Sequence, residues 1–161
     1  RTGDTRPINT GHWIVVSIYL AACGATLALA GKARSPQILA AAQLLAASWL
    51  ASVSVWRWVA PDLRLYGFAF IDLALAFIFF SMSRGKWFPV PLFFLHASLI
   101  AYHVYALLVG SGIGWIGAFL NRAFETALIY VMACAAFRIW RSARKIKDAP
   151  FPARLSVDDG P

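Results

Sequence analysis

The sequence is poor in acidic residues and in cysteine, with seven aspartates and glutamates against fifteen lysines and arginines and only two cysteines in 161 residues. Two cysteines exclude the disulfide-rich scaffolds that stabilise small secreted domains. The chain also lacks CxxC, HExxH, Walker and GxGxxG patterns, and it has no internal repeat. We therefore expect a protein that is not an enzyme, without catalytic residues, a cofactor or a metal site.

The sequence is instead rich in apolar residues, at 60% of the chain with a mean hydropathy of +0.66. Five apolar stretches are each about as long as a helix needs to be to cross a hydrocarbon core of ~30 Å. These stretches are His12–Gly31, Gln37–Val59, Leu65–Ser83, Phe88–Gly110 and Trp115–Phe137. The pattern predicts an all-α integral membrane protein, a bundle of five transmembrane helices, with a four-span bundle as the alternative.

The basic residues predict the orientation of these spans. Ten lysines and arginines fall on the side of the C-terminal tail, against four on the other side. By the positive-inside rule the N-terminus lies outside and the C-terminus in the cytoplasm, which is typical of a multi-pass protein of the bacterial inner membrane. The predicted parts are an outer tail (1–11), the five-helix domain (12–137) and a basic cytoplasmic tail (138–161).

The run of residues that follows the last span is strongly basic and could extend that helix along the membrane surface. We expect it to contact acidic lipid head groups or an acidic partner, unless it serves only as a topology anchor. The residues concerned are Arg138, Arg141, Arg144, Lys145 and Lys147. Nucleic acid is not an expected partner, because the basic residues are scattered and belong to no recognised binding motif.

Ionisable residues occur inside three of the predicted spans. Counted from the span ends, Asp72, His103 and Arg122 lie ~10 Å below the outer boundary, and Glu125 lies one turn deeper. Charges in hydrocarbon cost at least ~2.5–3.5 kcal/mol, so these side chains should face inward and pair. We expect one cluster in the outer half of the bundle, in which Arg122 pairs with Glu125 or Asp72 and His103 bonds the other carboxylate.

Two neighbours complete this predicted polar network: Asn121, and His96 near the midplane. His96 and His103 lie seven residues apart on one helix face, so they cannot both be axial ligands of one haem iron. Zinc would need His103, Asp72 and Glu125 together, and Arg122 would compete for those carboxylates. The network is either a functional site or a structural set of ion pairs that fixes helix register.

Small residues on the first span, Ala21, Gly24, Ala25 and Ala28, predict a face for close helix packing. Together these patterns favour a non-catalytic subunit or assembly factor of a larger membrane complex, with membrane lipids and other membrane subunits as partners. The alternative is a small transporter or ion- or proton-binding protein that uses the polar network through an opening on the outer side. A phage-type holin is a third hypothesis.

Overall fold

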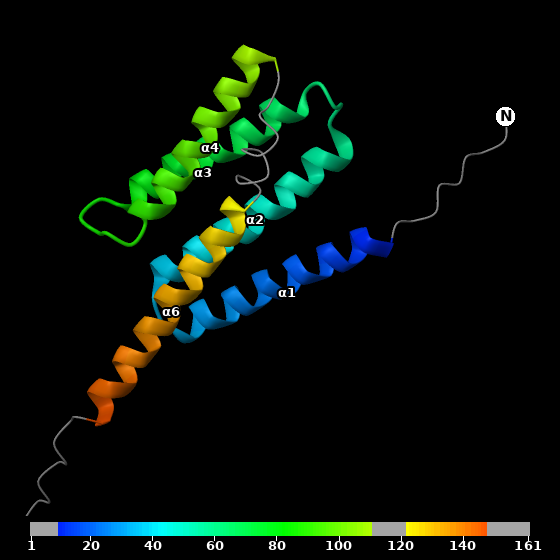
Figure 1. The fold of residues 1–161 in the computed structure, drawn as a ribbon. Helices are drawn as coiled ribbons and strands as arrows, with labels where there is room; N and C mark the ends of the chain where they lie inside the picture. Colours follow the sequence, from blue (N-terminus) through cyan, green and yellow to red (C-terminus); the bar gives the residue numbers. More distant parts are fainter. Residues whose placement is uncertain (1–9, 111–121, 148–161) are drawn as a thin grey trace, which may run out of the picture.

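The computed structural model describes residues 10–110 and 122–147, and in these ranges every regular element is an α-helix. The helices are α1 (Thr10–Lys32), α2 (Pro36–Trp58), α3 (Arg64–Met82), α4 (Val90–Val109) and α6 (Ala123–Lys147). Figure 1 shows these helices, with short turns between α1 and α2, α2 and α3, and α3 and α4. All five are long and apolar enough to cross a membrane, which confirms the predicted five-helix membrane bundle.

The outer surface of the bundle is itself apolar. Large side chains such as Ile18, Phe70 and Phe77 are more than half exposed along the middle of their helices. A soluble monomer rarely exposes such extensive apolar surface, whereas hydrocarbon tails solvate it without penalty. The exposed side chains are therefore those that a bilayer would contact.

The turns between helices follow from local chemistry. Pro36 occupies the first turn of α2, where its missing N–H is not needed. Gly85 and Gly110 adopt positive φ angles of 73° and 70°, and Gly110 ends α4 in the left-handed conformation that glycine tolerates. Arg34 also has a positive φ, of 49°, between α1 and α2.

The two ends of the bundle differ in charge. One end, here called the basic end, carries the α1–α2 turn, the α3–α4 turn and the C-terminal part of α6, on the left side of Figure 1. The described cations at this end are Lys32, Arg34, Arg84, Lys86, Arg138, Arg141, Arg144 and Lys145. The three described carboxylates, Asp62, Asp72 and Glu125, all lie elsewhere.

The tightly packed core lies in the half of the bundle nearer the basic end. Its largest fully buried side chains include Leu45 of α2, Phe79 of α3, Leu92 of α4 and Val131 of α6. Buried alanines such as Ala30 let the backbones approach closely between these larger groups. One half of the bundle is thus closely filled, and Phe79 of this core stacks on the ring of His96 at a separation of 5.6 Å.

Two sequence-based expectations are wrong in detail. The last span was expected to begin at Trp115, but α6 begins at Ala123, and its continuation to Lys147 is the helix extension that the basic run allowed. Residues 115–121 of that expected span lie outside the described residues. The predicted packing face on α1 is exposed, and a β-carbon added at Gly24 would meet no neighbouring group within 4 Å.

The close approach of two helices occurs instead between α2 and α3, at Gly67. A β-carbon at Gly67 would lie 2.8 Å from Cγ1 of Val55. Valine is branched at its β-carbon and has little rotamer freedom in a helix, so it cannot move aside cheaply. Gly67 therefore sets the separation of α2 and α3.

We predict that Gly67→Ala destabilises the protein by about 1–3 kcal/mol, because the added methyl group overpacks the contact with Val55. Combining it with Val55→Ala should recover most of the loss, and Gly24→Ala, on an open helix face, is the matched control. The midpoint of unfolding in detergent measures all three. Equal stability of Gly67→Ala and Gly24→Ala would contradict the close contact.

Candidate functional site

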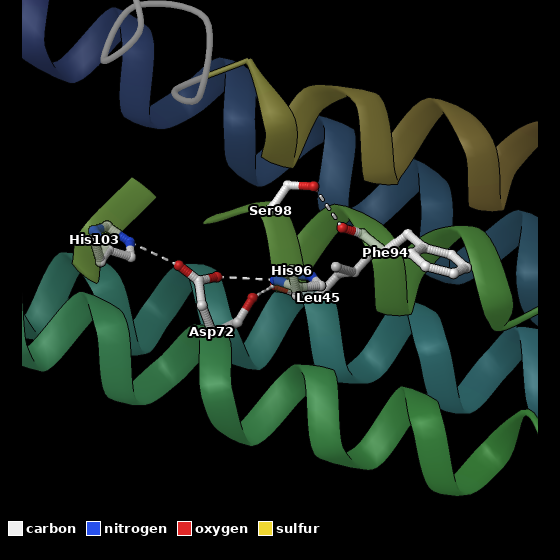
Figure 2. Close-up of polar contacts among 7 residues, drawn as sticks. Leu45, Asp72, Phe94, His96, Ser98 and His103 are labelled. Atoms are coloured by element: carbon white, nitrogen blue, oxygen red, sulfur yellow. Dashed lines mark hydrogen bonds and ion pairs between the residues drawn. The ribbon is translucent and has the colours of Figure 1, made fainter. Parts of the chain in front are cut away.

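A single carboxylate, that of Asp72 on α3, is bonded by two histidines of α4. His96 Nδ1 lies 2.9 Å from Asp72 Oδ1, and His103 Nε2 lies 2.9 Å from Asp72 Oδ2. Figure 2 shows the three side chains in a row, with the carboxylate between the two rings. Their side chains are only 5% (His96), 11% (His103) and 13% (Asp72) exposed. We call these three residues the Asp–His–His cluster.

The helix repeat explains why one carboxylate reaches both rings. Residues seven apart lie on the same face of a helix and are separated by about 10 Å along its axis. Asp72 is near the centre of α3, and His96 and His103 lie on either side of the centre of α4. The cluster therefore extends from the middle of these two spans, at His96, toward the end opposite the basic end, at His103. Asp72 and His103 lie close to the depths counted from the sequence.

The hydrogen bonds fix the chemistry of each ring. An ionised carboxylate only accepts, so His96 Nδ1 and His103 Nε2 are the donors to Asp72. The opposite nitrogens, His96 Nε2 and His103 Nδ1, are buried and have no hydrogen-bond partner among the described residues. Each of these two nitrogens is a basic lone pair in a neutral ring, or a donor in a protonated one.

A cavity of about 550 Å³ adjoins the cluster, and we call it the central cavity. Along α3 its wall runs from Leu65, at the start of the helix, to Leu75, past its centre. The titratable side chains that line it are Tyr19, Asp72, His96, Tyr102 and His103. The cavity thus extends from the level of the cluster toward the end of the bundle opposite the basic end, which is the half without the packed core.

A second polar group lies across α1 and α6. The Tyr19 hydroxyl donates to Glu125 Oε1 over 2.6 Å, and Arg122 Nη1 lies 2.9 Å from both carboxylate oxygens of Glu125. Tyr19 also stacks on Trp49 at a ring separation of 6.2 Å. Tyr19 connects this group to the central cavity, whose wall it shares with the Asp–His–His cluster.

The structure thus divides the expected network into two groups. Arg122 bonds Glu125, but no hydrogen bond among the described residues joins either of them to Asp72 or His103. Arg122 precedes α6 and its side chain is 72% exposed, so it lies at the helix end rather than ~10 Å inside. Glu125 in the first turn is favoured by the positive end of the helix dipole.

The contact with Glu125 stabilises the charged form of Arg122. The hydrogen bond and the charge of Glu125 raise the pKa of the Arg122 guanidinium above its ordinary value. Asn121, the remaining member of the predicted network, lies outside the described residues. Because Glu125 belongs to the second group, it does not join Asp72 and His103 as a third zinc ligand.

Sequence reasoning did not identify Tyr19. Its position in the middle of α1 was the available signal, because a hydroxyl group in an apolar span needs an acceptor. The described part of the chain contains no cluster of three or more histidine, cysteine, aspartate or glutamate side chains arranged to hold a metal ion.

The predicted lipid-contact residues lie along the C-terminal part of α6. Arg138 donates from Nε to the carbonyl oxygen of Ala33 over 3.2 Å, which ties α6 to the α1–α2 turn. The Arg144 guanidinium lies 4.0 Å from the ring centre of Trp140. Arg141 and Lys145 are exposed, and the side chain of Lys147 lies outside the described residues.

Comparison of the chain with protein-family models, with curated proteins and with solved structures finds no match.

We predict that the two groups differ in their contribution to stability. His103→Leu removes one of two donors to a buried carboxylate and should destabilise the protein by about 1–3 kcal/mol. Arg122→Leu should leave the unfolding midpoint in detergent nearly unchanged, because that side chain is exposed. A larger loss for Arg122→Leu than for His103→Leu would contradict the assignment of the buried polar centre to α3 and α4.

Proposed function

We propose that the protein binds a proton at the Asp–His–His cluster and works as a small proton- or ion-binding membrane protein. The observation that carries this proposal is the sharing of one buried carboxylate by two imidazole rings, each with a further buried nitrogen that has no partner among the described residues. The bonds to Asp72 use one nitrogen of each ring, and the second nitrogen of each ring is left as a site at which a proton can bind.

Charge balance supports the binding of one proton. With both rings neutral, the cluster carries the single negative charge of Asp72, which is unfavourable in the middle of a membrane span. Adding a proton to His96 Nε2 or His103 Nδ1 forms an N–H bond and turns that ring into an imidazolium. The cluster then has no net charge, and both hydrogen bonds to Asp72 are retained.

The central cavity supports access from one side. It reaches from the cluster toward the end of the bundle opposite the basic end, whereas the other half is closed by side chains such as Phe79 and Leu92. Its volume of about 550 Å³ is within the usual range of ligand sites and is lined by polar and apolar groups. Such a site suits the exchange of protons with the membrane face opposite the basic end. The cavity could bind a small polar ligand together with the proton.

The alternative function, an accessory subunit of a membrane complex, rests on the lack of chemical motifs and on the small-residue face of α1, which is exposed in the described structure. The phage-type holin rests on small size, multiple spans and a basic tail, none of which involves the Asp–His–His cluster. The cluster gives the ion-binding function a specific chemical basis, and for that reason we prefer it.

We also propose that the basic end faces the cytoplasm of a bacterium and that the chain resides in the inner membrane. The support is the excess of lysine and arginine at that end, in the turns and on α6. The central cavity would then open toward the outer face.

Proton binding can be counted directly. Titration of the purified protein in detergent between pH 5 and 9 should show uptake of about one more proton per chain in the wild type than in Asp72→Asn. In that variant an imidazolium would have no counter-charge and would be disfavoured. Asp62→Asn, which alters an exposed carboxylate, should titrate as the wild type does. Identical curves for wild type and Asp72→Asn would contradict the proposal.

The orientation is tested with reporter fusions. An alkaline phosphatase domain fused after Lys147 should be inactive and a fluorescent protein fused there active, because the positive-inside rule puts that end in the cytoplasm. Fusions after Pro61, in the α2–α3 connection at the opposite end, should give the reverse result. Phosphatase activity after Lys147 would contradict the proposed orientation, and the central cavity would then open toward the cytoplasm.

A further inference from the structure

The basic end of the bundle contains a second cavity, of about 780 Å³, which we call the basic cavity. It lies between the start of α2, the α3–α4 connection and the C-terminal half of α6. Its volume is that of a typical small-ligand site, and it is separate from the Asp–His–His cluster.

The charge of the basic cavity is of one sign. Four cations line it, Lys86, Arg138, Arg141 and Lys145, and no carboxylate among the described residues does. A cleft that is lined by one sign of charge between low-dielectric walls concentrates the field and attracts the opposite charge. The hydroxyl groups of Ser35 and Ser142 also belong to the wall. The ligand that fits is an anion with several acceptor oxygens, such as a phosphate group.

The remaining walls are apolar and well fixed. Phe88 stacks on Tyr130 at a ring separation of 5.7 Å, and the Tyr130 hydroxyl donates to the carbonyl oxygen of Phe88 over 2.8 Å. These contacts hold the α3–α4 connection against α6. Trp87 and Phe137 add aromatic surface at the level of the helix ends, where such side chains lie at a membrane interface.

We propose that the basic cavity binds the phosphate head group of an anionic glycerophospholipid from the surrounding membrane. The cations and the Ser35 hydroxyl meet the phosphate, because the Ser142 hydroxyl already donates to the carbonyl oxygen of Arg138. The aromatic wall meets the first part of the acyl chains. Basic pockets between membrane helices are known to recognise anionic head groups by this combination of charge and interfacial position. The inference is independent of proton binding at the centre of the bundle.

Two cations of α6 are suited to test the inference. Arg141 and Lys145 are four residues apart on one helix face, are exposed, and have no hydrogen-bond or ion-pair partner among the described residues. Arg84 and Arg144 lie at the same end but do not line the cavity, and Arg144 lies against Trp140. Removing either pair changes the net charge equally, so the second pair is a matched control.

The experiment is native mass spectrometry of the full chain in detergent, with phosphatidylglycerol or phosphatidylcholine of the same acyl composition as the probe. The wild type should retain phosphatidylglycerol in preference to phosphatidylcholine. The double variant Arg141→Gln/Lys145→Gln should bind phosphatidylglycerol roughly tenfold or more weakly, since each cation near an anionic head group contributes to affinity. The double variant Arg84→Gln/Arg144→Gln should bind it as the wild type does.

Several outcomes would overturn the inference. Equal weakening in both double variants would mean that only the overall charge of the basic end attracts lipid. Equal retention of the two lipids would exclude recognition of an anionic head group, and displacement of bound lipid by millimolar inorganic phosphate would make a free anion the ligand. If Arg141→Gln/Lys145→Gln loses its helical circular dichroism, Lys86→Gln in the α3–α4 connection serves instead and must weaken retention in the same way.

Discussion

The arrangement of the bundle depends on one constraint, the need to satisfy a carboxylate in the middle of an apolar span. Asp72 meets this need with two donors from a single neighbouring helix, His96 and His103 of α4. These two histidines lie two helical turns apart, and the carboxylate lies between them. Because both bonds must form at once, they fix the register and the rotation of α3 against α4. These two helices also share the most extensive contact in the described structure.

The packed core and the two cavities lie in different places relative to the Asp–His–His cluster. The half of the bundle toward the basic end is filled by side chains such as Leu45 and Phe79, while the central cavity adjoins the cluster and extends the other way. The basic end has its own cavity. Its charged side chains are lysines and arginines, whereas the central cavity is lined by a carboxylate and two histidines. The fold therefore combines a polar centre suited to a proton with a charged end suited to a membrane surface.

The sequence predicted the helices well because a span is a local property, given by the length and composition of an apolar run. It also predicted that Asp72 and His103 would lie at similar depths, which the span ends determine. It misplaced Arg122, because the apolar residues from Trp115 made the last span begin before Ala123, and hydropathy does not mark where a helix starts. The partnership of Tyr19 with Glu125 depends on how α1 and α6 are rotated, which no local pattern encodes.

The central claim is that Asp72 accepts hydrogen bonds from both histidines and that the pair holds an exchangeable proton. Nitrogen-15 NMR of histidine-labelled protein in lipid bilayers, in a His12→Gln background, tests it most directly. The account predicts two rings with strongly hydrogen-bonded N–H groups at neutral pH, of which one becomes imidazolium as the pH falls. Both signatures should vanish in Asp72→Asn. Spectra that are unchanged by Asp72→Asn would contradict the claim.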